Sequence, residues 1–105
     1  MTPEGKVKKD ISAYLKSLAP HCCYKMPVPC GFGKSGVDYD VCYYGCFVAI
    51  EAKKKGVKKA TPREEAYLQE VRAAGGYGFV ADDVSVVISM MEHIKLWYED
   101  VRTEC

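Results

Sequence analysis

Two apolar segments joined by a tight turn constrain the fold of this chain more than any other feature. Residues 37–44 and 46–52 are rich in valine, tyrosine, phenylalanine and isoleucine, and the turn lies at Tyr44-Gly45. Such residues favour strands, and a two-residue turn that ends in glycine favours a β-hairpin. With this turn Asp38 faces Glu51, and directly opposed like charges destabilise an antiparallel pair. The sequence therefore predicts a hairpin whose open end brings two carboxylates together unfavourably.

A divalent cation would remove this conflict. Mg²⁺ (or Mn²⁺) prefers oxygen ligands and is commonly held by one or two carboxylates together with substrate phosphate oxygens. Lys53 follows Glu51 by two residues, so its side chain is expected on the same face of the strand. A bound metal activates water for attack on a phosphodiester, and Lys53 would orient that water or neutralise the developing charge. The open alternative is a surface ion pair between Glu51 and Lys53, with Asp38 simply in a turn.

The flanking segments predict three helices and one further strand. Residues 3–18 place apolar side chains at three- and four-residue steps, as an amphipathic helix does. In “TPREEAYLQEVRAAGG”, Thr61 and Glu64 fit a capping box at the start of a second helix. “YGFVA” predicts a strand at 77–81, and the apolar spacing over 83–99 predicts a last helix.

The connection between the first helix and the hairpin is the least regular segment. Prolines and glycines over residues 21–35 predict a loop or a ragged edge strand. The element order is then α-β-β-α-β-α. It predicts a single α/β domain over residues 1–105, with a mixed sheet flanked by helices. In that sheet the strand after the second helix can lie parallel to the strand before it.

Basic residues gather in the segment that follows the hairpin. Six of the fifteen lysines and arginines lie within residues 53–63. Beside a metal site, such a cluster predicts contacts with a polyanionic backbone such as that of DNA, and the open alternative is a solvated turn. Nothing in the sequence indicates a module that reads bases, so recognition is expected to follow backbone shape. The predicted DNA-binding residues are Lys54, Lys55, Lys58, Lys59 and Arg63.

The sequence gives no sign of secretion or membrane insertion, and its cysteines do not favour a zinc site. The N-terminal segment has no continuous apolar stretch of a signal peptide, and no stretch approaches the roughly 18 apolar residues of a membrane-spanning helix. We therefore expect a cytoplasmic protein without a membrane association. The cysteines lack the two CxxC pairs of a structural zinc site, so free, mostly buried thiols are predicted and zinc is the weaker alternative. The six are Cys22, Cys23, Cys30, Cys42, Cys46 and Cys105.

Three motifs together resemble a known nuclease family. “SGVDYD”, then “IEAK” thirteen residues on, then “TPREEAYLQEVRAAGG” resemble the virus-type replication-repair nuclease (VRR-NUC) family of the PD-(D/E)xK superfamily. The resemblance covers most of the chain and implies a small restriction-endonuclease-like sandwich. It implies that Asp38, Glu51 and the backbone carbonyl of Ala52 are the metal ligands. Lys53 would be the catalytic lysine, and Glu4 would be the first-helix acid that completes the acidic cluster.

Two positions depart from the family pattern. Val37 stands where the family usually has a proline, which leaves Asp40 as an alternative to Asp38. The hairpin register and the thirteen-residue gap favour Asp38. Glu64 stands where the family has a glutamine that helps to shape the site. Either Glu64 contacts metal or water, or it only caps the second helix.

The resemblance also implies a reaction and a substrate. It implies a Mg²⁺-dependent deoxyribonuclease that hydrolyses phosphodiester bonds. Standalone members of the family are similar to Holliday junction resolvases, so a homodimer that cuts four-way or similar branched DNA is expected. The apolar positions of the last helix and of the 37–50 hairpin are the candidates for its two-fold contact. The alternatives are a flap or duplex DNA nuclease and a non-catalytic DNA-binding module. Phage recombination, DNA packaging and DNA repair all stay open as the pathway.

Overall fold

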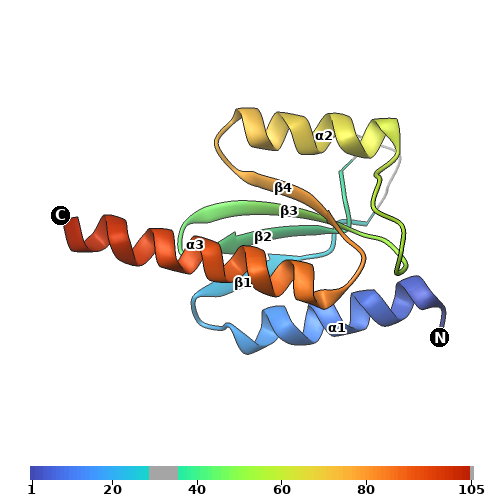
Figure 1. The fold of residues 1–105 in the computed structure, drawn as a ribbon, viewed down its shortest axis with the longest axis horizontal. Helices are drawn as coiled ribbons and strands as arrows, with labels where there is room; N and C mark the ends of the chain where they lie inside the picture. The colour runs from blue at the N-terminus through green and yellow to red at the C-terminus, as the bar shows by residue number, and fades with distance from the viewer. Residues whose placement is uncertain (29–35, 105) are drawn as a thin grey trace.

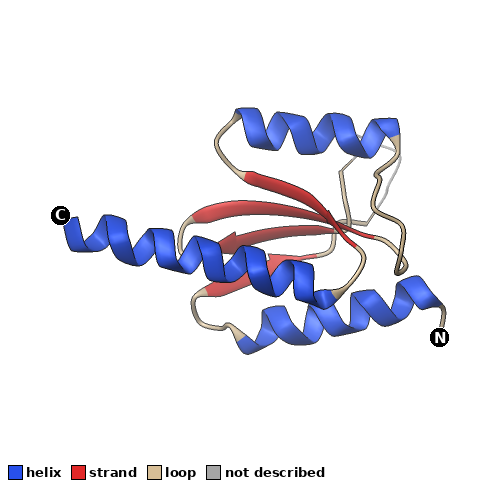
Figure 2. Cartoon of the chain, in the orientation of Figure 1, coloured by secondary structure: helices blue, strands red, loops and turns tan. Residues whose placement is uncertain are grey.

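The computed structural model describes residues 1–28 and 36–104. In this part of the chain, a mixed sheet of four strands has the order β1-β2-β3-β4 (Figures 1 and 2). The first two neighbouring pairs are antiparallel, and β3 and β4 are parallel, as expected for strands joined through a helix. The strands are β1 Cys22–Lys25, β2 Tyr39–Tyr43, β3 Cys46–Ala52 and β4 Tyr77–Ala81.

Three helices cover the two faces of the sheet unequally. Helix α2 (Pro62–Ala73) lies on one face, mainly against β3 and β4, whereas α1 (Pro3–Ser17) and α3 (Val84–Glu104) lie on the other face (Figure 1). The main core lies between the sheet and the α1–α3 layer, and a smaller core lies beneath α2. The largest side chains with no exposed surface in the main core are Ile11, Leu15, Tyr39, Val41, Val48, Ile50, Val87, Met91 and Ile94.

The observed order, α-β-β-β-α-β-α, contains one strand more than the predicted order α-β-β-α-β-α. The extra strand is β1, which lies at the sheet edge and pairs with β2 within the segment predicted as a loop or a ragged edge strand. Its sequence, CCYK, contains one residue of a type enriched in strands, Tyr24, and four residues are too short a run for alternation to predict a strand. Backbone pairing with β2 therefore decides its conformation. The rest of the predicted loop, 29–35, lies outside the described residues.

The predicted hairpin and its register are confirmed. Tyr39 pairs with Ile50 and Tyr43 with Cys46, as a turn at Tyr44-Gly45 requires. Both turn residues have positive φ, 49° for Tyr44 and 81° for Gly45. This is the backbone conformation in which a two-residue turn matches the twist of the flanking strands. The strand that follows α2 is parallel to β3, also as predicted.

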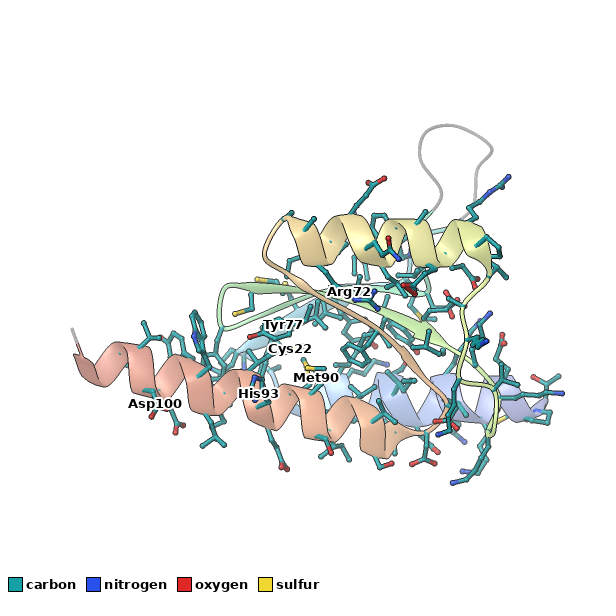
Figure 3. The ribbon with its side chains drawn as sticks, turned by 45° about the horizontal axis from the view of Figure 1, so that its top comes forward. Cys22, Arg72, Tyr77, Met90, His93 and Asp100 are labelled. Carbon is teal, nitrogen blue, oxygen red and sulfur yellow. The ribbon has the colours of Figure 1, made fainter. Side chains whose placement is uncertain are left out.

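The last helix is longer than predicted. α3 starts at Val84 and continues to Glu104, beyond the predicted end at residue 99. Its N-terminal half packs on the sheet, where His93 lies edge-on to Tyr77 of β4, with 6.2 Å between ring centroids (Figure 3). The apolar periodicity fades in the C-terminal half, but glutamate and arginine still favour a helix there. This part of α3 projects past the sheet (Figure 1).

Candidate active site

The predicted site residues meet at one end of the sheet. Asp38 immediately precedes β2, and Lys53 immediately follows β3. The N-terminal ends of α1 and α2 lie at this same end (Figure 1). Glu51 is the last but one residue of β3, so the antiparallel register brings it beside Asp38. Two strand ends and two helix starts therefore form the site.

Asp38 and Glu51 hold each other in place through the backbone. The Asp38 N–H donates to Glu51 Oε1 at 3.3 Å, and the Ala52 N–H donates to Asp38 Oδ2 at 2.9 Å. Ala52, which the resemblance implies as a third ligand, is fully buried beside the pair. The acidic pair that the hairpin register predicted is therefore present, and the strands themselves fix its geometry.

Glu51 is in an environment that disfavours its charge. It is 5% exposed. Burial first, and then the nearby carboxylates of Asp38 and Glu64, raise the pKa of Glu51 to about 8. A buried carboxylate next to a second carboxylate is stabilised as an anion only when positive charge is added. A cation bound at this position would therefore remove an unfavourable interaction that the fold creates.

Lys53 supplies one positive charge to the pair. Its Nζ lies 3.6 Å from Glu51 Oε2 and 2.9 Å from Glu64 Oε1. The hydrogen bond to Glu64 and the charge of Glu51 outweigh partial burial and raise the pKa of Lys53. The Glu51–Lys53 ion pair of the open alternative is therefore present, but with side chains only 7% and 16% exposed it is not on a solvated surface. Lys53 lies on the same face as Glu51, as the strand alternation predicted.

Glu64 both caps α2 and holds Lys53. Its Oε1 accepts from the Thr61 N–H at 2.8 Å, and Thr61 Oγ1 accepts from the Glu64 N–H at 3.2 Å, which completes the predicted capping box. Burial opposes ionisation of Glu64, but hydrogen bonds from Thr61 and Lys53 outweigh it and lower its pKa to about 2. The capping role is confirmed, and the same carboxylate also reaches the site through Lys53. A contact between Glu64 and metal or water stays a prediction.

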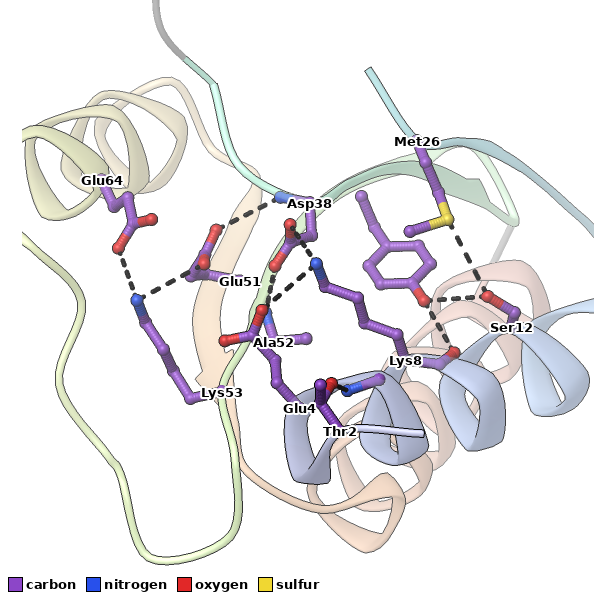
Figure 4. A network of polar contacts seen from close by, with 12 residues as sticks. Thr2, Glu4, Lys8, Ser12, Met26, Asp38, Glu51, Ala52, Lys53 and Glu64 are labelled. Carbon is purple, nitrogen blue, oxygen red and sulfur yellow. Dashed lines mark hydrogen bonds and ion pairs between the residues drawn. The ribbon is translucent and has the colours of Figure 1, made fainter. Parts of the chain in front are cut away.

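Helix α1 brings two residues to the acidic pair. Lys8 Nζ lies 3.3 Å from Glu4 Oε2 and 3.4 Å from Asp38 Oδ1 (Figure 4). This contact joins Glu4 to the cluster, where the resemblance placed it. The sequence interpretation gave Lys8 no role in the site. The four-residue spacing of Glu4 and Lys8 predicts their mutual ion pair, but no local signal shows that α1 reaches the open end of the hairpin.

Asp40 does not belong to this cluster. It pairs in register with Ala49 and Lys25, and its Oδ1 accepts from the Tyr67 hydroxyl at 3.3 Å. Asp38 is the aspartate whose carboxylate and backbone both contact the end of β3. The structure therefore supports Asp38 over Asp40 as the partner of Glu51.

The basic segment after β3 is held against the start of α3. The Gly56 N–H donates to Asp82 Oδ2 at 3.0 Å, and Lys58 Nζ lies 3.5 Å from the same oxygen. Lys55 Nζ lies 3.6 Å from Asp83 Oδ1. These two lysines are therefore partly neutralised. The other predicted DNA-binding residues, Lys54, Lys59 and Arg63, are exposed.

The donor set fits Mg²⁺ or Mn²⁺ in one specific way. Among the described residues, no group of three or more histidine, cysteine, aspartate or glutamate side chains is arranged to hold a metal ion. Two adjacent carboxylates with a backbone oxygen are nevertheless a sufficient protein contribution for Mg²⁺, which retains water and binds substrate phosphate. The raised pKa of Glu51 indicates that Lys8 and Lys53 do not offset its burial and the nearby carboxylates, and hard oxygen donors are the kind that these cations prefer.

The cysteines are only partly as predicted. Cys22 is buried and Cys46 is half-buried, but Cys23 and Cys42 are exposed, so the prediction of mostly buried thiols is wrong for these two. They pair in register across β1 and β2, whereas α2 packs mainly on β3 and β4. Cys30 and Cys105 lie outside the described residues. The four described cysteines are free thiols.

Comparison with known proteins gives no further assignment. No protein-family model, curated protein or solved structure matches this chain. Separately, none of the helices in the described ranges has the length and apolar content needed to cross a membrane. The cluster at the open end of the hairpin is formed by Glu4, Lys8, Asp38, Glu51, Lys53 and Glu64.

Proposed function

We propose that this chain is a Mg²⁺- or Mn²⁺-dependent deoxyribonuclease of the VRR-NUC type in the PD-(D/E)xK superfamily. The observation that carries the proposal is the buried carboxylate of Glu51, which lies beside Asp38 and 3.6 Å from the Lys53 ammonium. The cluster sets four carboxylates, those of Glu4, Asp38, Glu51 and Glu64, against the two ammoniums of Lys8 and Lys53, so a further positive charge is needed to balance it. A divalent cation provides that charge, and phosphodiester hydrolysis is a reaction for which such an ion is suited.

Each residue of the cluster has a defined part in this proposal. Asp38, Glu51 and the Ala52 carbonyl would hold the ion, which when bound would supply Lewis-acid stabilisation of a phosphate oxygen and an acidified water. Lys53 orients the attacking water and neutralises charge that develops on the phosphate. Glu64 keeps the Lys53 ammonium in place through the 2.9 Å contact. Glu4 adds a third carboxylate at the α1 side of the pair.

The surface next to the cluster supports DNA as the substrate. Lys54, Lys59 and Arg63 are exposed near Lys53 and Glu64, and phosphate contacts dominate the affinity of proteins for DNA. Asp82 and Asp83 partly neutralise Lys58 and Lys55, so this surface attracts phosphate less strongly than its number of lysines indicates. Binding by these lysines alone, without a metal site, is therefore the less favoured function.

A homodimer is part of the proposal. Phe47 of the hairpin is exposed on the α2 face of the sheet, beside Tyr67 and Val71, so it does not share a surface with α3. The exposed apolar side chains of the C-terminal half of α3 include Leu96, which is 62% exposed, and Trp97, which is 47% exposed. A second copy covering these side chains would place two active sites on one substrate. This arrangement suits a four-way junction, in which two strands are cut, and we propose branched DNA as the substrate on that basis.

A cleavage assay on DNA of defined shape tests the proposal. A four-way junction, a flap and a linear duplex of equal length would be incubated with Mg²⁺, Mn²⁺ or EDTA. We expect metal-dependent cleavage, with the junction cut fastest, and no cleavage by Lys53→Ala. Faster cleavage of the flap or the duplex would mean that the proposed substrate is wrong, while the proposed reaction would stand. Absence of cleavage on all three with either metal would leave a DNA-binding module as the function.

A further inference from the structure

Lys8 is the one member of the cluster to which the proposed reaction gives no part. Its ammonium lies between two carboxylates, 3.3 Å from Glu4 Oε2 and 3.4 Å from Asp38 Oδ1 (Figure 4). Partial burial lowers the pKa of Lys8, but Asp38 and Glu4 outweigh that effect and raise it. A lysine side chain is ordinarily a cation at physiological pH, and the Lys8 ammonium lies on the side of the acidic pair opposite Lys53 (Figure 4).

The backbone of Lys8 is fixed, whereas its ammonium is held loosely. The hydroxyl of buried Tyr39 donates to the Lys8 carbonyl oxygen at 2.9 Å and also lies 2.8 Å from Ser12 Oγ. This anchors the middle of α1 to β2. The contacts of the ammonium are longer than the roughly 2.7–2.9 Å of a strong charge-assisted hydrogen bond, and the side chain is 32% exposed. The ammonium can therefore leave Asp38 without disturbing α1.

Lys53 differs from Lys8 in this respect. Its Nζ has a 2.9 Å contact with Glu64, which the α2 capping box holds, and its side chain is half as exposed as that of Lys8. Lys53 is thus fixed at one end of the acidic pair, whereas Lys8 occupies the other end through two long contacts. The Lys53 ammonium is therefore fixed at the site, whereas the Lys8 ammonium can move.

We infer that Lys8 is a built-in counter-ion that a divalent cation must displace from Asp38. This inference rests on the proposed metal site. In the metal-free protein the Lys8 ammonium neutralises the Glu4–Asp38 side of the cluster. A cation held by Asp38 and Glu51 takes over that charge, and the two positive charges then repel each other at short distance. Lys8 therefore lowers the affinity of the site for metal and stabilises the protein without it.

Mn²⁺ binding to the wild-type chain and to Lys8→Met tests the inference. Methionine keeps an unbranched side chain that is one atom shorter, and it removes the charge. Calorimetric titration should show about fivefold tighter Mn²⁺ binding by the variant, the factor expected for loss of a competing, partly exposed ion pair. Urea unfolding should show that Lys8→Met is less stable than wild type without metal, and that saturating Mn²⁺ removes the difference. Lys8→Arg keeps the charge and should behave as wild type.

Lys6→Met is the matched control for overall charge. Lys6 lies on the same helix, is exposed, and pairs with Asp10 at 3.0 Å rather than with the site. Its replacement should leave Mn²⁺ affinity unchanged. If Lys8→Met does not fold, Lys8→Gln allows the same comparison with a polar side chain.

Three results separate failure of this inference from failure of the proposed function. If wild type binds Mn²⁺ and Lys8→Met binds it equally or more weakly, Lys8 positions Asp38 and the inference is wrong, while the metal site stands. If neither protein binds Mn²⁺, the metal site is wrong and the inference falls with it. If only Lys8→Met binds, the competition is supported, and the proposed metal-dependent function of the wild-type chain is wrong.

Discussion

The two ends of the hairpin differ in whether their side-chain contacts stabilise or oppose the folded state. At the turn end, Tyr44 stacks between His21 and Tyr98, with ring centroids 4.8 and 4.5 Å apart. At the open end, the buried carboxylate of Glu51 lies beside that of Asp38, whose side chain is 22% exposed. Aromatic stacking stabilises the fold, whereas buried like charges oppose it. The contrast indicates that the turn end stabilises the fold and that the open end retains an arrangement that opposes it.

The largest expected effect separates activity from stability at the open end. Asp38→Asn should reduce metal-dependent cleavage by about 10²–10³-fold, the loss typical for removing one charge-stabilising group from a site. An asparagine oxygen can still accept the Ala52 N–H, so the unfolding temperature should stay close to that of wild type. The measurement is single-turnover cleavage together with a thermal unfolding scan. Asp40→Asn, which affects the neighbouring contact with Tyr67, is the matched control and should keep full activity.

The turn end should respond in the opposite way. Tyr98→Ala removes one stacking partner of Tyr44 and should lower the free energy of unfolding by about 1–2 kcal/mol. The open end lies at the far end of the same strands, so Mn²⁺ affinity per folded molecule should not change. Urea unfolding and calorimetric titration check the two statements. A Tyr98→Ala protein of unchanged stability but reduced metal affinity would show that the two ends are not separable.

The pH dependence of stability should reveal the strain at Glu51. In the folded chain its pKa is raised from the ordinary 4.5 to about 8, so the unfolded state loses this proton first as pH rises. The contribution of Glu51 therefore makes the metal-free protein less stable as pH rises from about 4.5 to 8, with no further change above. A glutamine at this position cannot ionise, so the free energy of unfolding of Glu51→Gln should exceed that of wild type by more than about 1 kcal/mol at pH 8.

The difference in stability between wild type and Glu51→Gln isolates the contribution of the Glu51 carboxyl group. Glu64, whose pKa is lowered to about 2, contributes stability that is lost only as pH falls below about 4.5, outside the same window. Urea unfolding of wild type and Glu51→Gln at pH 5, 6, 7 and 8 is the measurement. A difference that stays constant across these four values would mean that Glu51 is already ionised in the folded protein.

The smallest effect concerns the basic surface near the open end. Lys59→Ala removes an exposed charge, so DNA binding should weaken a few-fold, and the slope of affinity against salt should fall by about one. Lys58→Ala should have a smaller effect, because Asp82 already partly neutralises Lys58. Binding of a catalytically inactive form to a four-way junction at several salt concentrations gives both slopes. Equal slopes for the two variants would show that the Asp82 contact does not matter for DNA.

The sequence predicted the parts of the fold and the site that local patterns determine. The turn at Tyr44-Gly45 fixed the register, and the register alone brought Asp38 to Glu51. Thr61 and Glu64 gave the start of α2 through a four-residue pattern. In each case the deciding interaction lies within a short segment or between strands joined by a tight turn.

The parts that the sequence did not predict depend on contacts between distant segments. The sequence leaves both a loop and a ragged edge strand open for the segment that contains β1, and pairing with β2 decides for the edge strand. Lys8 reaches Asp38 because α1 packs on a face of the sheet, where the Tyr39 hydroxyl donates to the Lys8 carbonyl oxygen. Likewise, the ion pairs of Lys55 and Lys58 with Asp83 and Asp82 join a loop to the start of a helix more than twenty residues away. Such contacts require knowledge of how the elements pack.

The central claim is that Asp38 and Glu51 share a divalent cation, and diffraction tests it most directly. Crystals soaked in Mn²⁺ would be measured at the manganese absorption edge, where the ion alone gives a strong anomalous signal. We expect one anomalous peak between these two carboxylates, within coordinating distance of both, with the Lys8 ammonium displaced from Asp38. Well-ordered side chains of Asp38 and Glu51 with no peak between them, in crystals that show Mn²⁺ bound elsewhere, would contradict the claim.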